Sequence, residues 1–319
     1  MEIGVKEACE RLKAMDNIVL LCHRNPDGDT IGTALALELI LEKLGKRVKV
    51  ECHDIFPKQF SYMFRSEKKE DFEPENIVAV DIADESLFGD DLKKYVGRSD
   101  LCIDHHPSNK HYAKDWLVRA EAAATAEIIP DICDELGIEI TKEMADCIYT
   151  GVVTDTGCFR YSNTTEHTHA VAGRMIKCGC DSFHITKRLF ETKSLSRIKL
   201  ETAALSTIEY HFKNRCALIY ITDDMIKKAG SDDSELDGVS AIPRQIEGID
   251  VGITLRERDN GFKVSLRTDD SIDASVICAR LGGGGHRCAA GCFIEDDLDT
   301  AKVAILSAVS ESLAEEEEC

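Results

Sequence analysis

Closely spaced carboxylate and imidazole side chains mark one segment near the N-terminus of the chain, residues 23–29 (HRNPDGD). The segment follows a short apolar run, residues 18–22, that is typical of a buried strand. Ligands of open α/β sheets bind at the carboxyl ends of the strands, and Pro26 and Gly28 favour a turn on which the side chains converge. Oxygen ligands with one imidazole favour a divalent metal such as manganese or magnesium over a thiolate-seeking metal.

Three further apolar runs lead to similar side chains. The runs 77–80, 100–103 and 147–153 are followed closely by Asp81, by Asp104-His105-His106 and by Asp155. One such loop alone is equally compatible with an ordinary solvated turn, but turns have no structural reason to repeat the arrangement four times. Without cations, four carboxylates would repel one another, namely Asp27, Asp29, Asp81 and Asp155. Two divalent ions balance their charge, and in two-metal sites such ions lie roughly 3.5–4 Å apart and share a bridging ligand.

In this order, the motifs resemble those of the DHH phosphoesterase family, which is named for a triplet like Asp104-His105-His106. A fifth feature, residues 282–286 (GGGGH) followed by residues 289–291 (AAG), is similar to the signature of the DHH-associated C-terminal domain. Within the family, the chain is most similar to the bifunctional nanoRNase (oligoribonuclease) and 3′-phosphoadenosine-5′-phosphate (pAp) phosphatase members. The resemblance covers almost the whole chain.

The pattern of elements predicts an α/β fold. Apolar runs alternate with helical patterns over the first half of the chain, which favours a mostly parallel sheet with flanking helices. Helices are expected over residues 30–44, with Thr30 as N-cap, and over 122–136, 142–153 and 167–178. A long helical pattern over 182–210 favours a connector, and strands over 217–221, 250–256 and 262–267 favour a smaller mixed α/β domain. With the resemblance, this predicts three parts: a DHH metal-binding catalytic domain over 1–185, a helical linker over 186–210 and a DHH-associated substrate-binding domain over 211–319.

The resemblance implies two metal-ligand sets that share Asp81. One ion would be held by His23, Asp27 and Asp81, and the other by Asp29, Asp81, His105 and Asp155. Manganese is the favoured ion, with magnesium and cobalt as alternatives. A water or hydroxide shared by the ions would attack phosphorus, because bound metals lower the pKa of water toward neutrality. Asp104 is expected to orient a histidine, and His106 to steady the scissile phosphate or to protonate the leaving oxygen.

Substrate-binding residues are expected mostly near the C-terminal signature. Backbone N–H groups of a glycine-rich nest approach a phosphate closely, and an arginine clamps a terminal phosphate through two hydrogen bonds. The arginines are also compatible with ordinary surface positions. The residues expected to bind substrate are Arg160, Ser265, Arg267, Gly283, Gly284, Gly285 and His286.

The resemblance implies a metal-dependent phosphodiesterase or phosphatase. Its expected substrates are 5′-phosphorylated oligonucleotides of two to about four nucleotides, with linear dinucleotides such as pApA included, and pAp. One alternative is an inorganic pyrophosphatase of the same superfamily, which shares the metal motifs but carries a different C-terminal domain. The other is a nucleotide-binding regulatory protein without turnover, a class that usually lacks some of the ligands.

Composition restricts the partners. The chain has 59 acidic and 39 basic residues and a formal net charge of −20, which disfavours binding to a long polyanion. Short oligonucleotides or a mononucleotide bisphosphate are therefore the expected partners, rather than long nucleic acid, and a homodimer is compatible with the sequence. The first fifteen residues lack the apolar core of a signal peptide, and the 14 cysteines lie largely among apolar residues. These features predict a cytoplasmic protein with reduced thiols and no membrane association.

Overall fold

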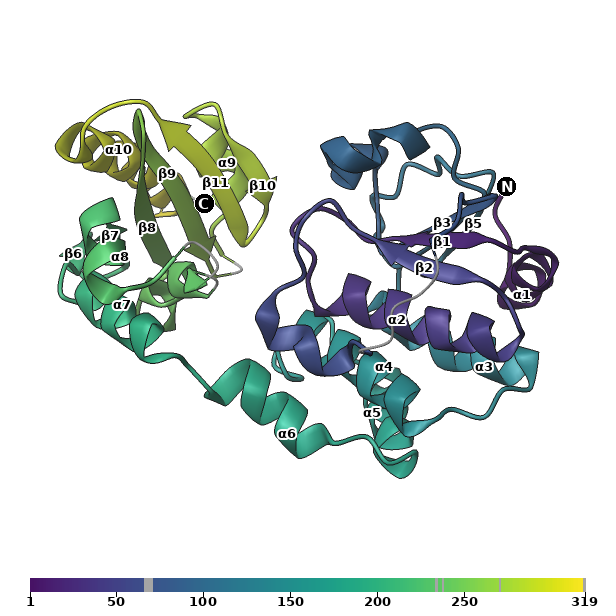
Figure 1. The fold of residues 1–319 in the computed structure, drawn as a ribbon. Helices are drawn as coiled ribbons and strands as arrows, with labels where there is room; N and C mark the ends of the chain where they lie inside the picture. The colour runs from purple at the N-terminus through teal and green to yellow at the C-terminus, as the bar shows by residue number, and fades with distance from the viewer. Residues whose placement is uncertain (66–70, 233–234, 237, 270, 318–319) are drawn as a thin grey trace. The chain divides into compact units, whose positions relative to one another are not determined.

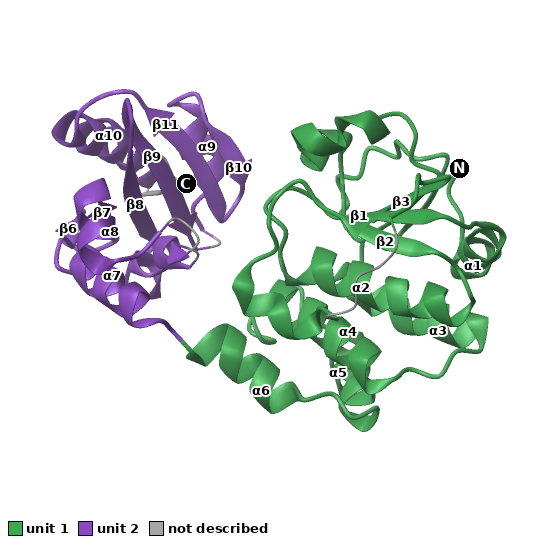
Figure 2. Cartoon of the chain, in the orientation of Figure 1, with its two compact units in different colours: residues 1–192 green, residues 193–319 purple. Residues whose placement is uncertain are grey.

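The structure is a computed structural model that describes residues 1–65, 71–232, 235–236, 238–269 and 271–317. The chain forms two compact units, Met1–Thr192 and Lys193–Cys319 (Figure 2). Each unit has its own sheet and its own hydrophobic core. The predicted α/β class, with a mostly parallel sheet followed by a smaller mixed domain, is confirmed.

The sheet of the first unit has five parallel strands in the order β2-β1-β3-β4-β5 (Figure 1). The strands are β1 (Ile18–Leu21), β2 (Val48–Glu51), β3 (Asn76–Val80), β4 (Leu101–Asp104) and β5 (Asp115–Val118). The three central strands are almost entirely buried, as expected for parallel strands covered on both faces. Because the strands run in one direction, the residues that follow β1, β3 and β4 reach the same edge of the sheet.

Helices cover one face of this sheet, and short helical turns cover the other. The helices are α1 (Val5–Ala14), α2 (Gly28–Lys43), α3 (Ile129–Leu136), α4 (Lys142–Asp155) and α5 (Glu166–Lys177). Alternate residues of β1 point to opposite faces, so that Leu20 packs with the helices, and Val19 with the turns η2 (Glu85–Phe88) and η3 (Asp90–Tyr95). Two further turns are η1 (Lys58–Met63) and η4 (Thr125–Ile128).

Two of the predicted helices begin at other residues than expected. The first begins at Gly28 rather than after Thr30, because the Asp27 side chain is the N-cap and accepts hydrogen bonds from the N–H groups of Asp29 and Thr30, at 3.0 and 3.1 Å. The pattern over 122–136 is not one helix, since Ala124 is extended and the turn η4 precedes α3. The helices predicted over 142–153 and 167–178 correspond to α4 and α5.

The long helical pattern over 182–210 is not a single connector. The helix α6 (Ser182–Thr186) continues into a π-helical turn, η5 (Lys187–Glu191), which ends where Thr192 becomes extended. The next helix, α7 (Leu195–Leu205), places Leu200 and Ala204 in the core of the second unit, because residues four apart share one helix face. Much of the linker predicted over 186–210 therefore belongs to the second unit, and the division falls between residues 192 and 193.

The sheet of the second unit has six strands in the order β10-β11-β9-β8-β7-β6. The strands are β6 (Glu209–His211), β7 (Cys216–Ile221), β8 (Val251–Arg258), β9 (Gly261–Thr268), β10 (Gly284–His286) and β11 (Ala289–Ile294). The strands β7 and β8 pair in parallel, and the other neighbours are antiparallel. The strands β8 and β9 form a hairpin, with Arg258 of β8 opposite Gly261 of β9.

The two faces of this second sheet differ in character. Apolar residues on one face pack with α9 (Ala274–Ala279) and α10 (Leu298–Glu317). On the other face, α7 and α8 (Asp223–Ala229) share a core with β7, near the turns η7 (Val239–Ala241) and η8 (Pro243–Gln245). The alternation of β8 and β9 leaves polar side chains on this second face: Thr254, Arg256, Ser265 and Arg267. Among the described residues, no helix has both the length and the apolar character needed to cross a membrane.

Candidate metal centre and active site

All the residues predicted as metal ligands lie together at the carboxyl edge of the first sheet. They form three overlapping groups, in each of which one ligand atom per residue lies within 4.8 Å of the others. The groups are His23 with Asp27 and Asp81, Asp29 with His105 and Asp155, and Asp81 with His105 and His106. The apolar run before Asp155 is helical, so that Asp155 is the last residue of α4 and does not follow a strand.

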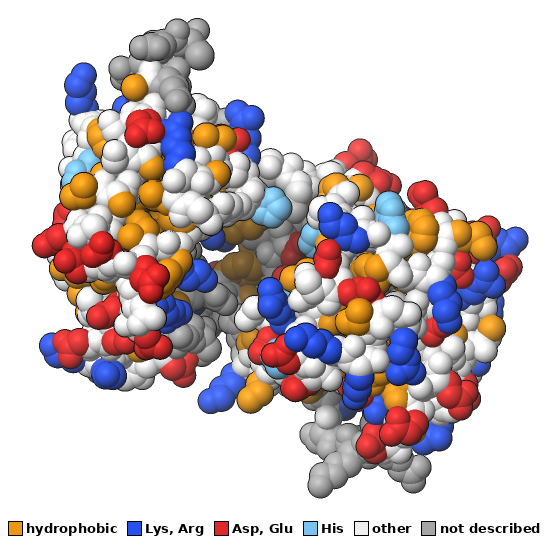
Figure 3. All heavy atoms as spheres, turned by 90° about the horizontal axis from the view of Figure 1, so that it is seen from above, with side chains coloured by type: hydrophobic (Ala, Val, Ile, Leu, Met, Phe, Trp, Pro, Cys, Tyr) orange, Lys and Arg blue, Asp and Glu red, His pale blue; other side chains and the backbone are white. Residues whose placement is uncertain are grey.

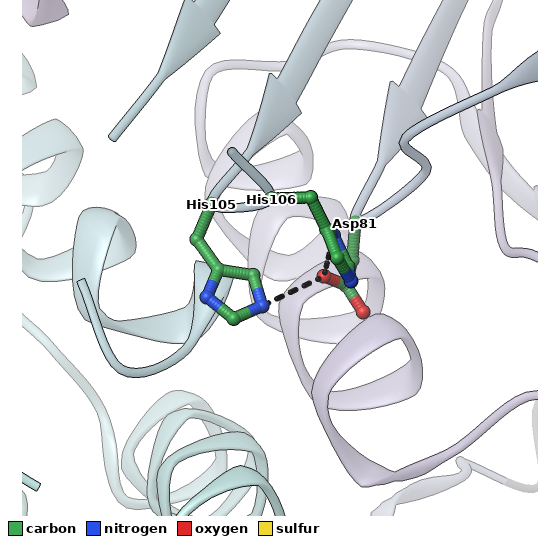
Figure 4. A group of neighbouring side chains, drawn as sticks. All are labelled: Asp81, His105 and His106. Carbon is green, nitrogen blue, oxygen red and sulfur yellow. Dashed lines mark ion pairs between the residues drawn. The ribbon is translucent and has the colours of Figure 1, made fainter. Parts of the chain in front are cut away.

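Asp81 lies between the first two groups. Its Oδ2 atom is 3.7 Å from Nε2 of His23, and its Oδ1 atom is 3.6 Å from Nε2 of His105. Figure 4 shows that His105 and His106 both contact one oxygen of this carboxylate, since Nδ1 of His106 also lies 3.6 Å from Oδ1. Asp81 has a φ of 59°, a left-handed conformation that costs a non-glycine residue about 1–3 kcal/mol and is concentrated at functional sites. Because Oδ2 lies near His23 and Oδ1 near His105, the two oxygens of Asp81 face different groups, as a bridging ligand requires.

Backbone carbonyls orient the two histidines that face this carboxylate. Nδ1 of His23 lies 2.8 Å from the carbonyl oxygen of Arg24, and Nδ1 of His105 lies 3.0 Å from that of Ala122. A carbonyl only accepts hydrogen bonds, so each Nδ1 carries a proton, and in the neutral form of each ring it is Nε2 that has the free lone pair. These contacts fix the tautomer that a metal ligand needs.

Asp29 is held by a segment that the sequence reasoning missed. Its side chain is fully buried and accepts hydrogen bonds from the N–H groups of Thr125, at 2.6 Å, and Ala126, at 2.9 Å. The Thr125 hydroxyl donates to Oδ1 of Asp81 at 2.8 Å. N–H groups at the start of a helical turn have no partner within the turn, so those of η4 are available to the carboxylate. A lone threonine in an alanine-rich stretch was the signal in the sequence.

Glycines allow α2 and α4 to bring their carboxylates together. A Cβ atom on Gly32 of α2 would clash with the carbonyl oxygen of Cys147 in α4. A Cβ atom on Gly151 of α4 would lie 2.7 Å from Oδ1 of Asp29, closer than real Cβ atoms approach other atoms. The distance between Asp29 and Asp155 thus depends on two positions that lack a side chain.

Burial and charge shift the pKa values of the cluster. Burial, together with Asp81 and Asp155, raises the pKa of Asp29 well above its usual range, and burial raises the pKa of Asp155 to about 6. Although burial opposes the shift, contacts with Asp27 and Asp81 raise the pKa of His23 to about 11. Although burial again opposes the shift, Asp155, Asp29 and Asp81 raise the pKa of His105 to about 10. In the absence of metal, protons supply the positive charge that the carboxylates need.

We expect metal binding to release two or more protons at pH 8, because His23 and His105 are protonated there in the metal-free protein and must be neutral to coordinate, and Asp29, whose pKa is raised, must be ionised. The release should decline as the pH rises through about 10 to 11, where both imidazoles are already neutral. Calorimetric titration of the chelator-treated protein with Mn²⁺, in buffers of different ionisation enthalpy, measures the number of protons. A binding enthalpy that is independent of the buffer would contradict this prediction.

Asp104 and His106 form a dyad beside the cluster. Asp104 is fully buried, and its Oδ1 accepts a hydrogen bond from Nδ1 of His106 at 2.7 Å. Its Oδ2 accepts one from Asn109 at 2.6 Å, a partner that the sequence reasoning did not identify. Although burial opposes the shift, His106 and Asn109 hold the pKa of Asp104 below its usual range, and Asp104 in turn raises the pKa of His106. The His106 side chain is 41% exposed, and its Nε2 has no hydrogen-bond partner in the described part of the chain.

The predicted substrate-binding residues have different surroundings. Arg160 donates from Nε to the carbonyl oxygen of Gly157 at 2.5 Å, its guanidinium lies 5.8 Å from the Phe190 ring, and no described contact joins it to the metal-ligand cluster. In the second unit, the glycine-rich segment forms the short strand β10 rather than only a loop. Strand pairing aligns the remaining residues in two rows across β10, β11 and β9. One row contains Gly284, Gly291 and Ser265, and the other contains His286, Ala289 and Arg267.

Comparisons with known proteins agree with this arrangement. The model of the DHH family, N-terminal domain, matches residues 17–152, and the model of the DHHA1 domain matches residues 216–315. The chain is 36% identical over 313 residues to the bifunctional oligoribonuclease and PAP phosphatase NrnA of Thermus thermophilus, covering 95% of this chain and 93% of that protein. It is 27% identical over 293 residues to the Bacillus subtilis protein of the same name, covering 90% of this chain and 92% of that protein.

Solved structures share the fold. An exopolyphosphatase-related protein from Bacteroides fragilis aligns with a TM-score of 0.89 at 25% identity, over 98% of this chain and 97% of that chain. Exonuclease RecJ bound to manganese aligns with a TM-score of 0.57 at 14% identity, over 99% and 95% of the two chains, and this likeness concerns the fold alone. From its motifs, fold and relatives, the chain belongs to the DHH family and carries both the N-terminal DHH domain and the DHHA1 domain.

Proposed function

We propose that this protein is a metal-dependent phosphoesterase that hydrolyses very short 5′-phosphorylated oligonucleotides and pAp. The observation that carries the proposal is Asp81, whose two carboxylate oxygens face two separate groups of potential ligands. The similarity over nearly the full length to relatives named oligoribonuclease and PAP phosphatase supports the substrate class.

The donor set fits two divalent ions. Carboxylates and imidazoles of this kind suit manganese, with magnesium and cobalt as alternatives. His23, Asp27 and Asp81 would hold one ion, and Asp29, Asp81, His105 and Asp155 the other. Bound there, the ions would supply an activated water and neutralise charge on the phosphoryl oxygens. The raised pKa values of Asp29 and Asp155 are those of a site built for cations.

His106 is the proposed proton donor to the leaving oxygen. Asp104 fixes the ring through Nδ1 and favours its protonated form, so that Nε2 is available to a substrate. In the second unit, Ser265, Arg267, residues 283–285 and His286 would bind the part of the substrate that does not react. The side chain of Arg160 would contribute from the first unit.

The proposed preference for short substrates follows from charge. Over the face shown in Figure 3, lysine and arginine side chains are interspersed with aspartate and glutamate rather than gathered in a continuous band. Proteins that hold long single strands use a basic groove with aromatic side chains on which bases stack. With a net charge of −20, this chain would repel the distal part of a long strand.

We therefore expect kcat/KM to be highest for pAp and for oligonucleotides of two to about four nucleotides, and to fall with length. Higher salt should narrow the difference, because screening weakens the repulsion of the distal phosphates. The test is a hydrolysis series with pAp, pApA, longer 5′-phosphorylated oligomers and pyrophosphate, in the presence of Mn²⁺. Chelation should abolish activity, and Mn²⁺ should restore it.

Three outcomes would contradict the proposal in different ways. Faster digestion of strands tens of nucleotides long would indicate a processive single-strand exonuclease. Efficient hydrolysis of pyrophosphate alone would indicate a pyrophosphatase. Tight nucleotide binding without turnover in any metal would indicate a regulatory protein.

A further inference from the structure

Arg244 lies in the turn η8 of the second unit and forms no ion pair with any acidic residue that the structure describes. Its Nε atom is buried and has no hydrogen-bond partner, and its guanidinium pairs with none of the residues that the structure describes. The chain has 59 acidic residues, and other arginines of this unit are neutralised. Arg256 pairs with Asp223 at 2.8 Å, and Arg215 pairs with Asp250 at 2.6 Å. A buried donor without a partner has lost its hydrogen bonds to water and gained none in return, and an incoming anion would supply them.

The backbone of Arg244 lies on the face of the sheet that carries Arg267. A Cβ atom added to Gly252 of β8 would lie 2.6 Å from the Arg244 nitrogen and 3.0 Å from its Cβ. Gly252 is directly opposite Arg267 in the antiparallel pair of β8 and β9. Paired residues point to the same face and have Cβ atoms about 4.5–5.5 Å apart, so Arg244 and Arg267 are neighbours on one surface.

A second buried polar group on this face also lacks a partner. Thr254 follows Gly252 by two residues on β8 and therefore points the same way. Its side chain is opposite Ser265, and the residue is only 4% exposed, yet its hydroxyl has no hydrogen-bond partner in the part of the chain that the structure describes. Small residues flank the neighbouring positions, with Ala289 opposite Arg267 and Gly291 opposite Ser265. This face therefore carries two buried donors, Nε of Arg244 and the hydroxyl of Thr254, that have no partner among the described residues.

We infer that Arg244 is a second guanidinium for the terminal 5′-phosphate of the substrate, beside Arg267. The inference rests on the proposed function and adds a specificity-determining residue to it. A phosphate monoester carries close to two negative charges near neutral pH, and a guanidinium matches its oxygens with paired donors. A substrate that ends in a 5′-hydroxyl would leave Arg244 as it is in the free protein, so the arginine would favour phosphorylated ends.

The test compares the full-length, metal-loaded protein with Arg244→Gln on pApA and on ApA, which lacks the terminal phosphate. We expect kcat/KM for pApA to fall about ten- to hundredfold, the loss typical of a hydrogen bond to a charged group, and kcat/KM for ApA to change less than about twofold. For Arg244→Lys, the fall in kcat/KM for pApA should be intermediate, because lysine keeps the charge but not the paired donors. Lys228→Gln removes one positive charge from an exposed position on α8 and should leave kcat/KM unchanged for both substrates.

The thermal midpoint of Arg244→Gln should match that of the wild type, since among the described residues the guanidinium has no partner to lose. Equal losses on pApA and ApA, or no loss on either, would overturn the role of Arg244 while leaving the proposed function intact. If the wild type hydrolyses neither the dinucleotides nor pAp, the proposed function fails. In that case the affinity for AMP, measured by calorimetry, tests the role of Arg244 separately. A tenfold weaker affinity in Arg244→Gln supports the inference, and an unchanged affinity overturns it.

Discussion

Asp81→Asn is expected to lose both metal ions and to lower turnover about a thousandfold or more, because bound metals supply several kcal/mol of transition-state stabilisation. The substitution removes the charge that both ligand groups share and replaces one carboxylate oxygen by an amide nitrogen that cannot coordinate. Asparagine tolerates the left-handed backbone of this position, where φ is 59°, so the loop should keep its conformation.

The measurement is the metal content of the purified variant after gel filtration, together with kcat on pAp and pApA. Asp84→Asn is a suitable control, because Asp84 lies three residues further along and caps the turn η2 through a hydrogen bond that asparagine can also accept. Two retained ions with normal turnover in Asp81→Asn would show that Asp81 is not the bridge.

His106→Asn is expected to lower kcat by about 10²- to 10⁴-fold on natural substrates while the metal content stays unchanged. A nitrophenyl leaving group needs no proton, so on a p-nitrophenyl ester of a nucleoside 5′-phosphate the loss should shrink to about tenfold or less. In the wild type, kcat should decline as the pH rises through the raised pKa of His106, because the donor form is then lost.

The chain offers a matched control for this dyad. Nδ1 of His184 lies 2.8 Å from Oδ1 of Asp181, a contact like that of His106 with Asp104, but on the exposed helix α6. His184→Asn should therefore leave kcat unchanged. Equal losses of kcat on both kinds of substrate would indicate that His106 steadies the phosphate. Loss of bound metal from His106→Asn would indicate that His106 is a metal ligand beside Asp81.

The convergence of the cluster was predictable because it follows from strand direction. Residues after buried parallel strands must reach one edge of the sheet, so Asp27, Asp81 and His105 could be placed together from their positions alone. A cation-binding site could be predicted for the same reason, since carboxylates brought this close together repel one another unless cations balance their charge.

Other features depend on tertiary contacts that leave little trace in the residue pattern. Thr125 and Ala126 bind Asp29 through backbone N–H groups, which every residue except proline possesses. The break after residue 191 was hidden by a sequence with good helical periodicity on both sides. The strand β10 contains two glycines, which have low strand propensity, and it forms because β11 is available to pair with it.

The uneven exposure of the carboxylates bears on how the protein would acquire its ions. The Asp27 side chain is 52% exposed, whereas that of Asp29 is fully buried. An ion held with Asp27 would exchange with the surrounding solution faster than one enclosed by Asp29. The ion beside Asp29 would therefore be the first to be held and the last to be lost. When free metal is scarce, the protein would persist in a half-loaded form that a single ion returns to activity, and its turnover would follow metal supply without any change in the amount of protein.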